Sequence, residues 1–149
     1  MSLIITGGTT TLLNFISKDL ILKTINQTCS SILILLNFFI NDNNNILEIK
    51  NKLTELDIQN KINIITLMLE ENIDKYNKKS INLSFLSIKE ILELLNNELN
   101  ELKDKIELYN KSYISYIKKF NSSLYIDNII KHNNILDNRL NLLLKIIRV

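Results

Sequence analysis

The sequence predicts an all-α protein: an antiparallel bundle of about four long helices, the last two forming a coiled-coil-like hairpin. Three observations support this prediction. Proline is absent from the 149 residues, and the only two glycines are adjacent, Gly7 and Gly8, so no helix breaker follows them. Leucine and isoleucine together supply 54 residues, enough for a large core. The apolar residues also recur at alternating spacings of four and three over long stretches, as in helices packed side by side.

The length is typical of one domain, and we expect a single helical bundle over 1–149. An apolar content of 46% with a net charge of only +2 excludes a disordered chain. Residues 1–8 are expected to form an N-terminal arm. Helices are expected at about 9–41, 46–76, 87–120 and 124–147. The stretches between them are rich in Asn and Ser, which favour turns and helix caps.

The first expected helix, 9–41, contains the densest apolar stretch of the chain, 32–40. An apolar seam follows it at helical spacing: Leu22, Ile25, Cys29, Ile32, Leu36 and Phe39. The stretch is much shorter than the roughly 20 residues that a bilayer crossing needs. We therefore expect no transmembrane span, and contact with a membrane surface stays open as an alternative.

In the second expected helix, 46–76, the apolar pattern changes phase near Asp57. One register runs from Ile46 to Leu56 and another from Ile58 to Tyr76. Such a shift indicates either a coiled-coil stutter or a kink in the helix.

The third expected helix, 87–120, has the most regular pattern. Ten residues alternate spacings of four and three without interruption: Ile88, Leu92, Leu95, Leu99, Leu102, Ile106, Tyr109, Tyr113, Tyr116 and Phe120. We expect them to be buried as a coiled-coil seam. Ser87 followed by Glu90 has the spacing of a capping box, which predicts that the helix begins there.

Charge predicts how the fourth helix, 124–147, packs. Residues 90–107 contain six acids and two lysines, whereas 108–149 contain seven basic residues and two acids. Helix 124–147 is therefore expected to fold back antiparallel on 87–120. This arrangement would bring Arg139, Lys145 and Arg148 beside Glu90, Glu93, Glu98 and Glu101. An antiparallel homodimer would satisfy the same charges.

The sequence offers few groups for catalysis or metal binding. Cys29 falls on an apolar seam, and His132, the only histidine, is expected to face solvent or cap a helix. One cysteine and one histidine cannot supply a classical zinc site. The segment 6–11 contains both glycines but lacks the lysine of a phosphate-binding loop. We therefore expect no enzyme, no metal and no cofactor.

The sequence contains more apolar residues than the core of one small bundle needs, which predicts association with other subunits. The stretches 32–40 and 62–69 are apolar on nearly all sides, more than a surface helix of an isolated bundle needs. We expect them to contact a second copy or another protein through Ile32, Leu36, Phe39, Ile62, Ile65 and Leu69. The leading hypothesis is a structural or assembly protein. The bias toward Ile, Asn, Lys and Leu is typical of an AT-rich genome and suggests a component of a virion or another large complex.

Two alternatives remain. Residues 109–120 interleave aromatic rings with lysines, the composition of a nucleic-acid contact, although core packing is the simpler interpretation of these rings. An accessory factor of this kind would use a basic surface made of Lys111, Lys118, Lys119, Arg139, Lys145 and Arg148. The other alternative is a membrane-associated subunit. No signal-peptide pattern opens the sequence, so we expect an intracellular protein or one within a viral particle.

Overall fold

The computed structural model describes residues 18–41, 46–72 and 78–148. Over these residues the fold is all-α, with no strand. Its elements are α2 (Lys18–Asn41), α3 (Leu47–Glu55), α4 (Ile58–Asn72), α5 (Lys79–Lys111), the 3-10 helix η3 (Tyr113–Tyr116) and α6 (Ser123–Arg148). The expected arm at 1–8, the first turns of the helix at 9–41 and the end of the helix at 46–76 lie outside the described residues.

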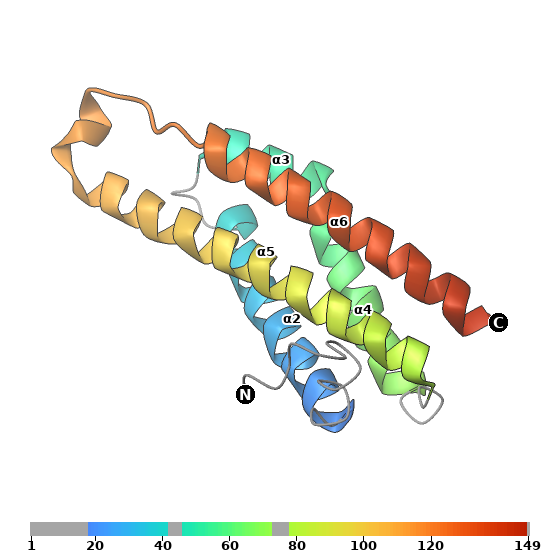
Figure 1. The fold of residues 1–149 in the computed structure, drawn as a ribbon. Coiled ribbons are helices and arrows are strands. Elements are labelled where there is room, and N and C mark those ends of the chain that lie inside the picture. Colours follow the sequence, from blue (N-terminus) through green and yellow to red (C-terminus); the bar gives the residue numbers. More distant parts are fainter. Residues whose placement is uncertain (1–17, 42–45, 73–77, 149) are drawn as a thin grey trace, which may run out of the picture.

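Helices α5 and α6 form the antiparallel hairpin that the sequence predicts (Figure 1). Asn128 donates a hydrogen bond to Glu98 Oε1 at 3.0 Å, and Arg139 donates one to the carbonyl oxygen of Ser87 at 2.5 Å. Arg139 is eleven residues after Asn128 on α6, and Ser87 is eleven residues before Glu98 on α5. The two helices therefore keep one register along the hairpin.

Helix α2 packs directly against α5 and runs parallel to it. Short loops predict this relative direction, but they do not predict that these two helices are neighbours. Ser31 Oγ donates to Asn96 Oδ1 at 2.8 Å, and Lys103 Nζ lies 4.9 Å from the centroid of the Phe38 ring. These contacts are seven residues apart on both helices and in the same direction. Because α3 and α4 return along α2, α5 starts at the same end of the bundle as α2 (Figure 1). Consecutive helices alternate in direction, but the first and third are neighbours.

The core forms where the apolar seams of the helices meet. On α5, six residues of the predicted seam are buried: Ile88, Leu92, Leu95, Leu99, Leu102 and Ile106. On α2, the predicted seam is buried in full: Leu22, Ile25, Cys29, Ile32, Leu36 and Phe39. Removing this much apolar surface from water is the main favourable contribution to folding.

A polar contact joins α4 to α6. Lys61 Nζ donates to Asn133 Oδ1 at 2.9 Å and forms an ion pair with Asp137 at 2.8 Å. Asn133 is buried, so its amide oxygen needs a partner inside the protein. The lysine supplies that partner, and the contact joins α4 to α6.

The expected helix 46–76 is two helices. It is interrupted at Leu56 and Asp57, and Asp57 has a φ of 56°, in the left-handed region. The phase shift is therefore a break in the helix and not a stutter. The break lets both segments bury their own apolar registers, with Ile49 and Leu53 in α3 and Ile58 and Ile62 in α4 all buried.

Helix α5 begins at Lys79, eight residues before the expected start. The capping box at Ser87 and Glu90 is wrong, because Ser87 Oγ donates to the carbonyl oxygen of Ser84 inside the helix. Buried Ile81 and Phe85 explain the extension, since their packing stabilises two further turns.

The earlier start of α5 also corrects the expected charge pairing. With the register set by Arg139 and Ser87, Lys145 lies level with Ile81 of α5, and Arg148 lies level with Lys78. The basic end of α6 therefore runs beside the added turns of α5 and not beside its acidic stretch.

By length and composition alone, α2 is the one helix in the described part of the chain that could cross a bilayer. Core helices of bundles pass the same test. Eight residues of α2 are buried inside the protein, and Lys23, Asn26 and Gln27 are exposed on its other face. This division is that of an amphipathic core helix.

We expect Leu99→Ala to lower the free energy of unfolding by about 2 to 5 kcal/mol, because it leaves a cavity in the fully buried seam. Leu94→Ala on the same helix is the matched control, because Leu94 is exposed, and should cost less than about 1 kcal/mol. Urea denaturation measures both values. Equal losses would show that the seam is not buried in solution.

We expect Asp57→Ala to be about 1 kcal/mol less stable than Asp57→Gly, because only glycine adopts a positive φ without steric cost. Both variants remove the contact from Asn60 to the Asp57 carboxylate, so their difference isolates the backbone contribution. Equal stabilities in urea denaturation would contradict the left-handed turn at this position.

Candidate functional site

The tip of the α5–α6 hairpin projects beyond the rest of the bundle. In the register of the hairpin, the first residue of α6, Ser123, lies level with Lys103 of α5. In the register of the parallel pair, the last residue of α2, Asn41, lies level with Ile106. The segment 107–122 therefore extends past both neighbouring helices, as the end of the hairpin in Figure 1 shows.

Short polar side chains and the backbone hold the tip in shape. Ser112 ends α5 in an extended conformation, and its hydroxyl accepts a hydrogen bond from the amide of Ile114. Ser115 Oγ donates to the carbonyl oxygen of Ser112 at 2.9 Å. The Tyr109 hydroxyl donates to the carbonyl oxygen of Lys118, and its ring lies 5.4 Å from that of Phe120. The tip is thus ordered without burying its large apolar side chains.

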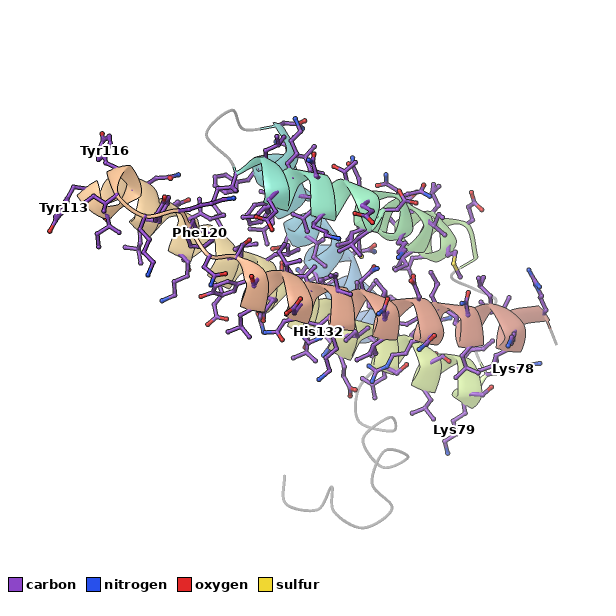
Figure 2. The ribbon with its side chains drawn as sticks, turned by 90° about the horizontal axis from the view of Figure 1, so that it is seen from above. Lys78, Lys79, Tyr113, Tyr116, Phe120 and His132 are labelled. Atoms are coloured by element: carbon purple, nitrogen blue, oxygen red, sulfur yellow. The ribbon has the colours of Figure 1, made fainter. Side chains whose placement is uncertain are left out.

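Four large side chains of the tip are exposed. The exposed fractions are 75% for Tyr113, 49% for Ile114, 90% for Tyr116 and 78% for Ile117. Figure 2 shows both tyrosine rings at the end of the hairpin, pointing outward from the ribbon, with Phe120 closer to the bundle. The prediction that Tyr113 and Tyr116 continue the buried seam is wrong, because α5 ends at Lys111 and α6 has not yet begun.

The predicted basic surface is divided between two ends of the molecule. Lys111, Lys118 and Lys119 lie at the tip and are exposed. Lys145 and Arg148 are exposed in the last turns of α6, at the opposite end. Arg139 is half-buried between them, where it binds the Ser87 carbonyl oxygen. These six residues therefore do not form one continuous surface.

The six residues expected to contact another subunit are in the interior of this chain. The exposed fraction is at most 2% for each of Ile32, Leu36, Phe39, Ile62, Ile65 and Leu69. Their apolar surroundings reflect packing within one bundle, because α2 lies between α4 and α5 and buries more than one face. Other side chains of these helices, among them Ile34 and Leu67, are the exposed ones.

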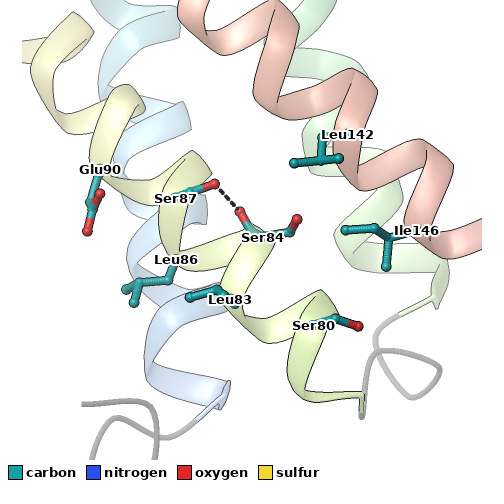
Figure 3. Close-up of a pocket in the computed structure, with 8 residues that line it drawn as sticks. All are labelled: Ser80, Leu83, Ser84, Leu86, Ser87, Glu90, Leu142 and Ile146. Atoms are coloured by element: carbon teal, nitrogen blue, oxygen red, sulfur yellow. Dashed lines mark hydrogen bonds between the residues drawn. The ribbon is translucent and has the colours of Figure 1, made fainter. Parts of the chain in front are cut away.

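A groove of about 380 Å³ lies between the start of α5 and the end of α6. Figure 3 shows Leu142 and Ile146 across from Ser80 and Ser84. Its lining residues are Ser80, Leu83, Ser84, Leu86, Ser87, Glu90, Leu142 and Ile146. The Ser87 hydroxyl is already bound to the backbone of Ser84, and Glu90 is the single ionisable group of the lining. This composition provides apolar surface but no paired acid and base.

The reactive side chains of the chain are apart from this groove. Cys29 is buried on α2, and burial raises the pKa of its thiol from 9.0 to about 11, while a hydrogen bond with the Thr66 side chain acts in the opposite direction. The thiol is therefore protonated at neutral pH and unsuited to nucleophilic attack. His132 lies half-buried on α6, and its Nδ1 has no hydrogen-bond partner among the described residues.

Within the described ranges, no three His, Cys, Asp or Glu side chains come together as they would around a metal ion. Comparison of the chain with protein-family models, with curated proteins and with solved structures gave no match. The candidate site therefore rests on the geometry of the chain itself, and the exposed tip is its most distinctive surface.

Because burial raises the pKa of Cys29 above its value in the unfolded chain, this residue stabilises the fold fully below pH 9 and loses that effect as the pH rises toward 11. We expect the stability difference between the wild type and Cys29→Ala to shrink over this interval by on the order of 2 kcal/mol. Tyrosines and lysines titrate in the same pH range in both proteins, so their effect on stability cancels in the difference between the wild type and the variant. A difference that stays constant with pH would contradict the shift.

Proposed function

We propose that this protein is a non-enzymatic interaction protein that docks end-on through the tip of its α5–α6 hairpin. The docking surface, here called the tip surface, consists of Tyr113, Ile114, Tyr116, Ile117 and Lys118. The observation that carries the proposal is the exposure of four large side chains within five consecutive residues. Contiguous exposed apolar groups of this kind are typical of interaction sites in soluble proteins.

The construction of the tip supports this proposal. Its serines and Tyr109 hold the backbone through hydrogen bonds within the tip, so the exposed rings are not needed to order the segment. A surface that is ordered before binding loses less conformational entropy when a partner covers it. The tip is thus pre-organised for binding.

The assembly role expected from the sequence is kept in this proposal, but the contact surface changes. Some exposed apolar residues elsewhere in the bundle, such as Ile34 on α2 and Leu94 on α5, have mostly polar residues three or four positions away on the same helix. Isolated apolar residues of this kind are normal on protein surfaces. In the tip surface, by contrast, four exposed apolar side chains lie together on one projecting turn.

A nucleic-acid contact is the second candidate, and the exposure of Tyr113 and Tyr116 beside Lys118 favours it. Exposed rings can stack on bases, and lysine neutralises phosphates. Ile114 and Ile117 provide neither interaction, which makes this candidate the weaker one.

The test measures three associations of the purified chain: self-association by sedimentation velocity, binding of a labelled single-stranded oligonucleotide by anisotropy, and co-flotation with phospholipid vesicles. We expect Tyr116→Ser/Ile117→Ser to weaken one of these associations by roughly tenfold or more, because it removes apolar contact area. The matched control is Ile34→Ser/Leu94→Ser, which removes exposed apolar groups from the side of the bundle and should change none of them. The absence of all three associations, or equal losses in both double variants, would contradict the proposal.

A further inference from the structure

We propose that the partner of the tip surface is an anionic lipid bilayer, into whose headgroup region the tip inserts. This inference rests on the proposed function and names its partner. Three properties of the tip lead to it: the kind of apolar residues it exposes, its projecting shape and its charge.

The exposed residues match the chemistry of a bilayer interface. Ile114 and Ile117 present aliphatic surface, which gains only from entering an apolar phase. Tyr113 and Tyr116 each combine an apolar ring with a hydroxyl group, and such rings concentrate at the level of the lipid headgroups. A single turn therefore carries both the aliphatic groups for the acyl boundary and the amphipathic rings for the layer above it.

The shape of the tip favours a deformable partner. The tip is one turn of 3-10 helix at the end of a projecting hairpin, and the side chains of Tyr113 and Tyr116 point outward in different directions (Figure 2). A flat protein surface could contact only some of the exposed side chains, whereas lipids can surround them all.

The charge of the tip selects an anionic surface. From Leu108 to Ile126 the sequence contains three lysines and no acid, a net charge of +3. The whole chain has a net charge of +2, so the remaining residues together have a net charge of −1. An anionic surface therefore attracts the tip, where the exposed apolar side chains can enter the headgroup region beside the lysines. The exposed cations at the opposite end, Lys78, Lys79, Lys145 and Arg148, do not stand beside such a projecting turn. Two copies docked tip to tip would set like charges together.

Acidic groups occur only behind the tip. Glu107 pairs with Lys103, and Asp104 and Glu107 lie beside Lys111 at the base of the hairpin. On the other side, Glu48 and Glu55 of α3 share a shallow groove with Lys119. Lys118 is thus the lysine of the tip with the fewest acidic neighbours, and it is adjacent to Ile117.

Vesicle flotation tests the charge part of the inference. We expect the full chain to float with phosphatidylcholine vesicles that contain phosphatidylserine, and to bind more weakly to phosphatidylcholine alone or at high salt. Lys118→Ala/Lys119→Ala should lower the partition coefficient about fivefold per lysine that faces the membrane. The matched control is Lys78→Ala/Lys79→Ala, an adjacent exposed pair at the opposite end of the molecule (Figure 2), which should leave binding unchanged.

Insertion is tested by fluorescence, because the chain contains no tryptophan. Tyr116→Trp places a single reporter on the tip, and Ile34→Trp places one on the exposed side of α2. With anionic vesicles we expect the emission of the tip reporter to shift to shorter wavelength and to be quenched by brominated lipids. The reporter on α2 should show neither change.

The results separate this inference from the proposed function. The absence of flotation, equal losses in both lysine pairs, or an unchanged tip reporter overturns the lipid partner. If the oligonucleotide is then bound in a tip-dependent way, or self-association depends on the tip, the docking function stands with another partner. If no association depends on the tip, both proposals fall.

Discussion

The apolar seam of α5 is the constraint on which the rest of the structure depends. From Ile88 to Ile106 the seam is excluded from solvent, and α5 shares its closest helix packing with α2 and α6. Each fully buried leucine or isoleucine contributes roughly 1.5 to 3 kcal/mol, so a seam covered on one side only would forfeit much of the stability of the chain. The bundle is built to cover this helix on both sides.

Covering α5 from two sides determines the topology. Helix α6 folds back after the tip and runs antiparallel to α5. Helix α2 runs parallel to it, which requires α3 and α4 to return along α2 before α5 begins. The break at Asp57 lets the returning segment keep its apolar residues buried, and Lys61 joins α4 to α6 through Asn133 and Asp137. These polar contacts are directional, so they select an orientation that apolar packing alone leaves free.

The tip surface follows from a mismatch in helix length. Helix α5 has 33 residues, about 50 Å, whereas α2 ends near the level of Ile106 and α6 starts near the level of Lys103. Neither α2 nor α6 therefore covers the turn at 113–117. Tyr116, which has the spacing of the seam, and its neighbour Ile117 become the most exposed apolar groups of the described chain. The candidate site is thus a consequence of packing elsewhere in the molecule.

Charge and short connections indicated the antiparallel hairpin, although an antiparallel homodimer satisfied the same charges. The sequence by itself determined the helical class and the apolar seams of α2 and α5, and it left the phase shift near Asp57 open between a stutter and a kink. These features depend on local spacing, which a helix repeats every 3.6 residues whatever lies beside it. Only the tertiary structure decided where each seam is covered. Ile81 and Phe85 extend α5 at its start because they find partners, and Tyr113 and Tyr116 have the same spacing as the seam but no partner. Ile32 and Ile62 belong to the core of one chain for the same reason. A periodic pattern specifies which face is apolar, whereas burial depends on the lengths and directions of the other helices.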